Sequence, residues 1–353
     1  MASGTPNTEH DIRTATLVDL PTLRRLAEHA TILDCELGCT RESVGVHDLL
    51  MTSRFWGAHT LIGRVNRQQV IGQYRCKPHE HLAQMVFVAP YLEEGADNTA
   101  WLHVIDAITA DAGRRGATML TAEVEETSAL FTTMRAAGFA VYARQELWRG
   151  AIPFPDRVTP AKLTRETSDD TFDIQVLYSN IVPRLVQPFG VPSTDSEGYV
   201  YRDPDSGRVR AYVAVSEGKY GVYLMPYLHP DIGYRDAAAI LAGAVLSDAR
   251  AASRAERAPV YVSVRRYQDW LESALEEMGF EVVGQQAVMV RHIAAGIRHA
   301  YTSLTQAFET NAALHVPHIA PHSTPGVNPS GKIQRVSRIG RLGDFTSRRW
   351  NVV

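Results

Sequence analysis

The chain has 353 residues, of which 45% are hydrophobic and 21% charged, and its formal net charge is −3. These values are typical of soluble globular proteins, and the length allows two domains that each bury a core. No stretch approaches the ~18 consecutive apolar residues of a membrane span, and the first residues lack the pattern of a secretory signal. We therefore expect a cytoplasmic protein that does not contact a membrane.

The charge is distributed unevenly along the chain. From Gly331 onward six basic residues accompany a single acidic one, which leaves the rest of the chain more acidic than the overall value suggests. Such a body is a poor platform for nucleic acid, because binding to phosphates needs cations on the docking face. We expect no nucleic-acid binding except through the basic tail.

Three cysteines are present, and this sparse usage fits a reducing compartment. Cys35, Cys39 and Cys76 could form a four-ligand zinc set with His79. The spacing is loose compared with known zinc motifs, so the interpretation we favour is three small buried thiols and no metal.

One segment of the sequence occurs twice. MVFVAPYL at Met85–Leu92 returns as YGVYLMPYL at Tyr220–Leu228. Each copy is followed by an alanine-rich helical pattern, a short β-like run, a second helical pattern and a Gly-Phe step, at Gly138 and Gly279. Such self-similarity predicts two copies of one β-α-β-α-β unit.

Periodicity predicts the elements of the first unit in chain order. A strand and a helix open the unit, and alternating apolar residues then indicate three strands. A helix follows, with Trp101, Ile105 and Ile108 on one face. After the opening pair, the predicted elements are strands 59–65, 68–76 and 81–88, helix 98–112, strand 117–124, helix 128–137 and strand 139–148.

The second unit repeats this plan after a proline-containing linker. Its predicted elements are helix 172–186, strands 199–202, 208–215 and 220–225, helix 235–252, strand 260–264, helix 267–278 and strand 280–292. The predicted organisation is a flexible N-terminus at 1–10, a first domain at 11–150, a linker at 151–170, a second domain at 171–294, and at 295–353 a helix with an extended or disordered basic tail.

This order of elements resembles the GCN5-related N-acetyltransferase (GNAT) superfamily, twice over. The opening IRTATLVDLPTLRRL is similar to the first strand and helix of that family, and ALFTTMRAAGF and WLESALEEMGF resemble its last helix. The resemblance implies an α/β (α+β) fold of two tandem acyl-CoA N-acyltransferase-like domains, each with a mixed, mostly antiparallel sheet flanked by helices. The duplication also suggests that the two domains pack as a pseudo-symmetric pair and pair their closing strands.

The resemblance implies acetyl-CoA as co-substrate. In the family the fourth and fifth strands splay apart, and the pantetheine arm lies in the opening as a pseudo-strand. Backbone N–H groups there can stabilise the oxyanion that develops during acyl transfer. The family pattern maps onto two sets, Phe87, Val88 and Ala89 in the first copy and Tyr223, Leu224 and Met225 in the second.

The phosphate-binding loops depart from the family pattern. The first reads PYLEEGADNTAW, with Glu93 and Glu94 where positive charge is usual. N–H groups for a phosphate at the helix start would come from Gly95, Asn98 and Thr99 in the first copy. The second reads PYLHPDIGYRDA and offers Gly233 and Arg235.

The catalytic side chains are also unusual. Many relatives carry a tyrosine proton donor where this chain has Met134 and Leu275. Glu123 and Glu125, near the end of the fifth strand, are the best-placed candidates for the base that an amine substrate needs. The competing interpretation is a solvated strand end, since glutamate is mostly exposed.

Three functions follow from these features. The resemblance implies an acyl-CoA-dependent N-acetyltransferase that acts on a small-molecule amine or a peptide amine of unknown identity. The degenerate loops would also suit a non-catalytic GNAT-like protein that binds a ligand or a partner. In a third variant one copy is the enzyme and the other is its structural mate.

Overall fold

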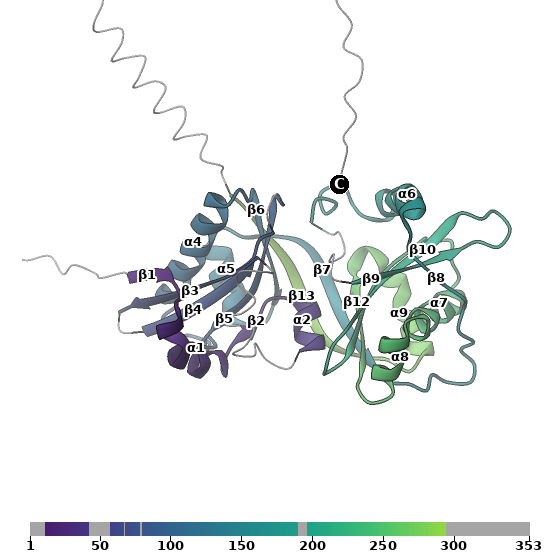
Figure 1. The fold of residues 1–353 in the computed structure, drawn as a ribbon, viewed down its shortest axis with the longest axis horizontal. Coiled ribbons are helices and arrows are strands. Elements are labelled where there is room, and N and C mark those ends of the chain that lie inside the picture. The colour runs from purple at the N-terminus through teal and green to yellow at the C-terminus, as the bar shows by residue number, and fades with distance from the viewer. Residues whose placement is uncertain (1–10, 42–56, 67, 78–79, 190–195, 294–353) are drawn as a thin grey trace, which may run out of the picture. The chain divides into compact units, whose positions relative to one another are not determined.

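The structure, a computed structural model, describes residues 11–41, 57–66, 68–77, 80–189 and 196–293 (Figure 1). The predicted N-terminal segment 1–10, the tail 295–353 and His79 lie outside these described residues.

A single sheet runs through both halves of the described chain (Figure 1). It has 13 strands in the order β1-β3-β4-β5-β6-β13-β7-β12-β11-β10-β9-β8, with β2 placed beside β5. The strands are β1 (Asp11–Thr14), β2 (Thr31–Ile32), β3 (Ala58–Val65), β4 (Gln68–Arg75), β5 (Leu82–Ala89), β6 (Met119–Glu125), β7 (Ala140–Gly150), β8 (Thr164–Arg165), β9 (Glu197–Arg202), β10 (Val209–Glu217), β11 (Val222–Leu228), β12 (Val260–Arg265) and β13 (Glu281–His292).

The sheet is mixed and mostly antiparallel, as predicted. β5–β6 and β11–β12 are parallel, because α4 and α7 carry the chain back to the starting edge of the sheet. The helices are α1 (Leu20–Ala27), α2 (Cys35–Thr40), α4 (Thr99–Arg114), α5 (Ala129–Ala136), α6 (Thr171–Ile181), α7 (Tyr234–Ser247), α8 (Ala249–Ala255) and α9 (Glu272–Glu277), with 3-10 turns η1 (Leu17–Asp19), η2 (Ser168–Asp170) and η3 (Arg266–Leu271).

The two halves exchange their closing strands. β13, from the end of the second half, lies between β6 and β7 of the first, so that Val288 pairs with both Glu123 and Ala143. On its other side β7 pairs with β12, where Gln145 lies opposite Arg265. The expectation that the closing strands pair is confirmed, and the exchange brings residues of both halves together at the centre of the sheet.

Helices cover both faces of the sheet because neighbouring strand residues point in opposite directions. On β4, Ile71 packs in the cluster that contains Leu23 of α1, whereas Val70 packs in the cluster that contains Ile105 of α4. In the second half, α7, α8 and α9 share one core cluster with β10, β11 and β12, and α6 packs in another.

The repeated Gly-Phe steps end equivalent helices. Gly138 (φ +86°) and Gly279 (φ +79°) adopt the left-handed conformation that glycine tolerates without strain. The following N–H of Phe139 bonds to the carbonyl of Met134, and that of Phe280 bonds to the carbonyl of Leu275. This is the glycine-dependent helix ending that the sequence repeat encodes.

Most predicted elements are confirmed within a few residues, with three differences in the second half. The predicted helix 172–186 ends at Ile181, because Pro183 follows and the residue before a proline favours an extended conformation. The predicted helix 235–252 is broken at Asp248, whose carboxylate accepts hydrogen bonds from the N–H groups of Arg250 and Ala251 and so caps α8. The predicted helix 267–278 begins as the 3-10 segment η3, because Gln268 has non-helical angles (φ −125°, ψ 26°). β2 and α2 in the first half, and the short strand β8 within the predicted linker 151–170, were not expected.

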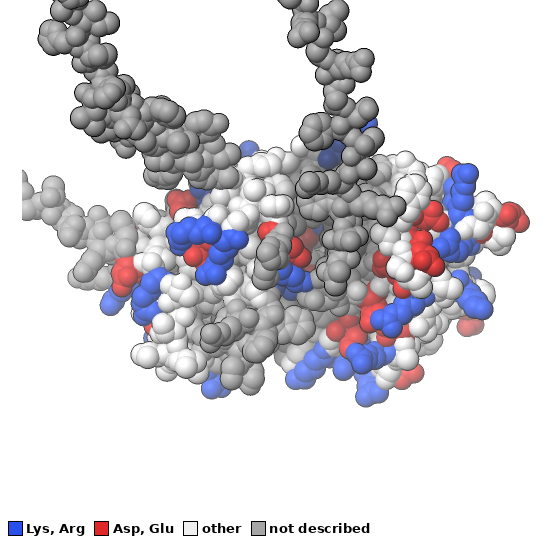
Figure 2. Space-filling view, turned by 45° about the horizontal axis from the view of Figure 1, so that its top comes forward, with Lys and Arg blue, Asp and Glu red and all other residues white. Residues whose placement is uncertain are grey.

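The structure also bears on surface charge, membrane spans and metal ligands. On the face drawn in Figure 2, basic and acidic side chains alternate and no continuous basic surface is visible. Within the described ranges no helix is long and apolar enough to cross a membrane. The described residues also include no group of three or more His, Cys, Asp or Glu side chains that could hold a metal ion, and the three cysteines are buried and free.

Candidate functional site

Each parallel strand pair separates part-way along its length. In the first half, pairing between β5 and β6 ends at Gln84 and Thr121, although both strands continue. In the second half, pairing between β11 and β12 ends at Leu224 and Val262. We call these points the first and the second opening; each is the kind of position to which the resemblance assigns the pantetheine arm.

The sequence-based placement of the second opening needs a correction. Tyr223 and Leu224 still pair with β12, so only Met225 of the predicted set lies beyond the end of pairing. Phe87, Val88 and Ala89 all lie beyond the end of pairing in the first half, so alignment on the prolines of the PYL repeat places the second set closer to the start of its strand than the first set.

The first opening is filled by the protein's own main chain. Thr31 and Ile32 of β2 pair with Val88 and Phe87, the residues predicted to bind the cofactor. The N–H of Leu33 donates to the carbonyl of Val86 (2.8 Å), and the Leu33 carbonyl accepts from the N–H of Glu123 (2.9 Å). Leu33 thus bridges β5 and β6 where a pantetheine arm would have to pair, and the first opening does not fit an acyl-CoA. Ala89, the remaining residue of this predicted set, is buried at the end of β5.

The loop that leads into α4 is also unfavourable for a phosphate. Thr99, the first residue of α4, donates its N–H (3.0 Å) and its hydroxyl (2.5 Å) to the carboxylate of Asp97. Asn98 directs its side-chain amide to the hydroxyl of Thr133 (3.0 Å), and Gly95 lies in the preceding turn with φ +75°. A carboxylate therefore already occupies the predicted anion position at this helix start.

The second opening is filled by a side chain. Gln268 of η3 is 1% exposed, and its Nε2 donates to the carbonyl of Pro226 (2.9 Å) while its Oε1 accepts from the N–H of Leu228 (3.0 Å). Pro226 lies two residues beyond the end of pairing in the second half, as Val86 does in the first. One carboxamide thus satisfies one carbonyl and one N–H, which are the contacts that an amide of a pantetheine arm could make. Displacement of Gln268 would free these two backbone groups for a ligand.

The start of α7 differs from the start of α4. Gly233 is the N-cap residue of α7 and provides no side-chain cap. Arg235 is exposed, and its guanidinium lies over the Tyr234 ring, 5.7 Å from the centroid. N–H groups at a helix start without a side-chain cap favour an anion and a nearby arginine strengthens this preference, whereas Asp236 in the first turn opposes it.

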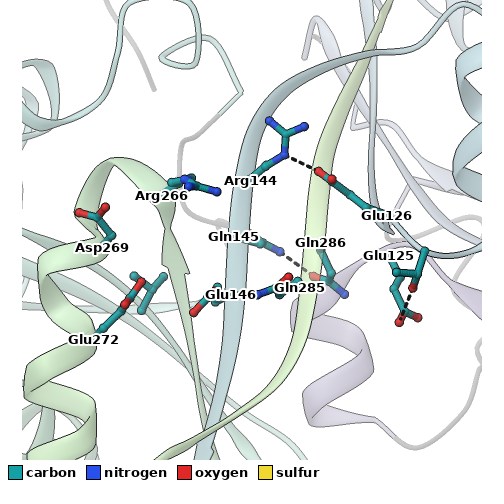
Figure 3. A pocket seen from close by; sticks show the side chains of 12 residues that line it. Glu125, Glu126, Arg144, Gln145, Glu146, Arg266, Asp269, Glu272, Gln285 and Gln286 are labelled. Atoms are coloured by element: carbon teal, nitrogen blue, oxygen red, sulfur yellow. Dashed lines mark hydrogen bonds and ion pairs between the residues drawn. The ribbon is translucent and has the colours of Figure 1, made fainter.

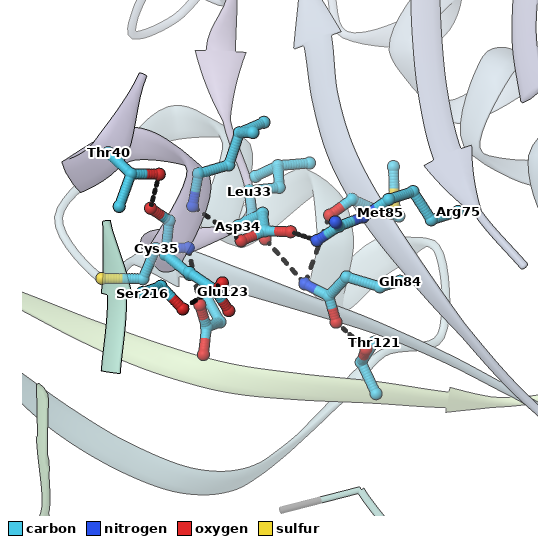
Figure 4. A network of polar contacts seen from close by, with 12 residues as sticks. Leu33, Asp34, Cys35, Thr40, Arg75, Gln84, Met85, Thr121, Glu123 and Ser216 are labelled. Carbon is cyan, nitrogen blue, oxygen red and sulfur yellow. Dashed lines mark hydrogen bonds and ion pairs between the residues drawn. The ribbon is translucent and has the colours of Figure 1, made fainter. Parts of the chain in front are cut away.

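The exchanged strands bring Glu123 of β6 to Arg265 of β12, beside the second opening. Arg265 Nη2 lies 3.2 Å from Glu123 Oε1, and the two side chains are only 7% and 12% exposed. The other carboxylate oxygen accepts the N–H of Cys35 (2.7 Å) at the start of α2, as Figure 4 shows. Glu123, predicted as a base for the first copy, therefore lies next to residues of the second.

Burial controls the protonation of this pair. Burial raises the pKa of Glu123, and the nearby Asp34 raises it further, while Arg265 and the Cys35 N–H oppose the shift. Burial would lower the pKa of Arg265, but attraction to Glu123 and neighbouring tyrosines outweighs it, so the guanidinium remains charged. A carboxylate with a raised pKa is a better general base near neutrality than an ordinary glutamate.

Three buried polar atoms around Arg265 lack a hydrogen-bond partner among the described residues. They are Arg265 Nη1 and the hydroxyls of Tyr223 and Tyr267. Burial raises the pKa of Tyr223, and a side-chain interaction with Ser263 opposes this shift, although the Ser263 hydroxyl itself donates to Gln145 (3.0 Å). Unpaired buried donors are rare in folded proteins, and three of them around one guanidinium call for an explanation such as a catalytic role or a bound polar group.

Glu125, the second predicted base, lies in different surroundings. It is exposed and lines a pocket of about 730 Å³ over β7 and β13 (Figure 3). The pocket lining includes five carboxylates and two guanidiniums, but Arg144 pairs with Glu126 (2.6 Å) and Gln285 donates to Glu146 (2.9 Å). The structure therefore separates the two predicted bases: the side chain of Glu123 is 12% exposed, whereas Glu125 lies at the surface.

Comparisons with known proteins support the fold. No family model matches the chain, and no curated protein matches it. Among solved structures, a GCN5-related N-acetyltransferase from Sphaerobacter thermophilus aligns with 80% of this chain and 96% of its own at 12% identity and a TM-score of 0.52. A tandem GNAT protein from the clavulanic acid biosynthesis pathway aligns with 81% of this chain and 99% of its own, at 14% identity and a TM-score of 0.51.

The chain has the GNAT fold, in two tandem copies. In this GNAT fold the positions of the missing tyrosine donor, Met134 and Leu275, are fully buried in the two cores. Sequence reasoning missed β2, Gln268 and Arg265. The sequence held a weak signal for β2, since the apolar pair Ile32 and Leu33 is followed by Asp34, a typical N-cap residue. In the structure Asp34 caps α2 by accepting the N–H of Leu37 (3.0 Å). No local signal marks Gln268 or Arg265, which matter only through partners distant in sequence.

Proposed function

We propose that this protein is an acyl-CoA-dependent N-acetyltransferase whose single acyl-transfer site lies at the second opening and is completed by Glu123 from the first half. The first half then serves as the structural mate that supplies the base. The observation that carries the proposal is the buried Glu123–Arg265 pair beside the second opening. The fold shared with GNAT structures supports the reaction class.

The chemistry required of the protein is modest. Acyl transfer joins the amine nitrogen to the thioester carbonyl carbon and breaks the C–S bond, with loss of one proton from nitrogen and protonation of the departing thiolate. Glu123 can accept the proton, because its raised pKa keeps it basic enough at neutral pH. The phenol of Tyr267 can supply the other, since burial raises its pKa and keeps it protonated. Holding the two reactants side by side provides much of the remaining rate enhancement.

A calorimetric titration of the full chain with acetyl-CoA tests the proposal. We expect one binding site per chain, because the first opening is filled by main chain and the second only by the Gln268 side chain. Arg235→Ala, at the start of α7, should weaken binding 3- to 10-fold. The matched control is Arg250→Ala on exposed α8, which should leave binding unchanged.

A second function is favoured by one specific observation. The backbone groups of both openings are already satisfied by the chain itself, which a non-catalytic GNAT-like binding protein would also display. Absence of binding at millimolar acetyl-CoA would overturn the acetyltransferase proposal and leave this alternative. Binding of two acetyl-CoA molecules per chain would contradict the proposal that the first opening is closed.

A further inference from the structure

Arg265 is a buried guanidinium that uses only part of its hydrogen-bonding capacity. The residue is 5% exposed, and Nη2 donates to Glu123. Nη1 is buried and finds no partner among the described residues. A guanidinium carries five N–H donors in a planar fork that suits a carboxylate, so a buried and unused nitrogen points to a planar anionic acceptor.

Two tyrosines add donors to the same centre. Tyr223 is 1% exposed, its hydroxyl has no described partner, and the same is true of the Tyr267 hydroxyl. Both lie close enough to Arg265 to influence its protonation, and burial raises the pKa of each phenol so that it remains a donor. The carboxylate of Glu123 already accepts from Arg265 Nη2 and from the Cys35 N–H, and neither Arg265 Nη1 nor either tyrosine hydroxyl is bonded to it.

We propose that Arg265 Nη1 and the Tyr223 hydroxyl bind a carboxylate of the acceptor, so that the substrate is an amine that also carries a carboxylate, in the manner of a free amino acid. This inference rests on the proposed function, since it places the acceptor at the same site. Tyr223 and Arg265 come from β11 and β12, the two strands that border the second opening, and Glu123 is within hydrogen-bonding reach of Arg265.

The charge balance favours a zwitterion over a simple amine. Glu123 and Arg265 form a neutral pair, the nearby Asp34 is paired with Arg75, and a hydrogen bond with Cys39 together with burial raises the pKa of the Cys35 thiol so that it stays uncharged. A simple ammonium ion would meet Arg265 with the same sign of charge at close range, which is unfavourable in a buried environment. A zwitterion places its amine toward Glu123 and its carboxylate toward Arg265, so that each charge faces its opposite.

Binding of matched pairs of compounds to the full chain tests this inference without acetyl transfer. L-phenylalanine and L-lysine are compared with phenethylamine and cadaverine, which lack only the carboxylate, by calorimetry and by thermal shift in the absence of acetyl-CoA. We expect at least 10-fold tighter binding of the amino acid in at least one pair. Tyr223→Phe should weaken that binding about 5-fold and leave the simple amine unaffected.

Tyr223→Phe also separates recognition from structure. The substitution removes only a hydroxyl that has no hydrogen-bond partner among the described residues, so the melting temperature should stay constant or rise. Tyr261→Phe, on neighbouring β12, is the matched control and should change neither affinity. Arg265→Lys, which keeps the charge but loses the planar fork, should also weaken amino-acid binding.

The outcomes distinguish this inference from the proposed function. If acetyl-CoA binds but neither amino acid is preferred over its amine, the acceptor inference is wrong and the acetyltransferase proposal stands. If Tyr223→Phe leaves amino-acid binding unchanged, the unpaired donors serve water only and the inference is again overturned. If amino acids bind through Tyr223 while acetyl-CoA does not bind, the acceptor site stands and the acetyltransferase proposal fails.

Discussion

Glu123 Oε1 and Arg265 Nη2 lie 3.2 Å apart although the two residues are separated by 142 positions in the chain. Neither half of the duplicated fold contains this pair by itself. β13 pairs directly with β6, and β7 pairs directly with β12, so the strand exchange is what sets Glu123 and Arg265 beside each other. The candidate site is thus a property of the tandem arrangement.

Glu123→Gln should lower kcat/KM at least 100-fold with little change in acetyl-CoA affinity, because a positioned general base contributes about 10²–10⁴-fold to rate. Glutamine keeps an oxygen that can accept the Cys35 N–H, which helps to preserve the local fold. Steady-state kinetics with calorimetry of acetyl-CoA measures both quantities. Glu125→Gln, on the same strand but exposed, is the matched control; a comparable loss in that variant would rule out a specific role for Glu123.

Activity and stability should change in opposite directions with pH because of Glu123. Its pKa is raised above 4.5, mainly by burial and also by Asp34, against the pull of Arg265. kcat/KM should therefore rise with pH through this raised pKa, since only the carboxylate accepts a proton. The folded state binds that proton more readily than the unfolded state, so the contribution to stability is complete below about 4.5 and is lost as pH rises through the folded pKa.

Glu123→Gln should remove this contribution to the pH dependence of unfolding, which denaturant titrations between pH 4 and 8 would detect. The nearby Cys35 thiol and Tyr223 phenol have raised pKa values and stay neutral in this range. An unchanged pH profile in Glu123→Gln would show that other groups control it.

Gln268→Leu should destabilise the free protein and increase the rise in melting temperature that acetyl-CoA causes. Loss of the carboxamide leaves the Pro226 carbonyl and the Leu228 N–H without partners, at a cost of about 1–3 kcal/mol. A pantetheine amide would restore these contacts, so acetyl-CoA should raise the melting temperature more than in the wild type. Gln73→Leu is the matched control, because it removes another buried carboxamide, which is bonded to Thr60 (2.9 Å). This variant should lose stability, but acetyl-CoA should not raise its melting temperature more than in the wild type.

Each half begins with the same charged cap, and both caps should support stability at neutral pH. Asp19 accepts from both guanidinium nitrogens of Arg13 (2.7 Å each) and from the N–H of Thr16 (2.8 Å), and these contacts hold its pKa far below 3.8. Burial opposes ionisation of Asp170, but Thr167 and Arg202 outweigh it and lower the pKa. Both carboxylates therefore stabilise the fold above about pH 4, and this stability is lost as the pH falls through the lowered pKa values.

Asp19→Asn and Asp170→Asn should each lower the free energy of unfolding by about 1 kcal/mol at pH 7, and by much less at pH 2. Chemical denaturation at the two pH values measures the difference. Equal losses at both would show that the negative charge is not what stabilises the cap.

The sequence by itself determined the fold class and most of its elements. Alternation and helical periodicity are local signals, and the glycine of each Gly-Phe step ends a helix through its own left-handed backbone. These features need only neighbours along the chain, so they could be recognised twice and matched to a known family. The departures of both phosphate loops, including Glu93 and Glu94, were visible for the same reason.

Only the tertiary structure decided what occupies each opening and which residues form the site. Leu33 fills the first opening and Gln268 the second through partners far away in sequence, and the position of the second opening depends on where strand pairing ends after Leu224. The environments of Glu123 and Glu125 differ because the exchanged strands bury one beside Arg265 and leave the other exposed. Such long-range pairing is set by packing and hydrogen bonding across the whole sheet, and no local pattern in the chain encodes it.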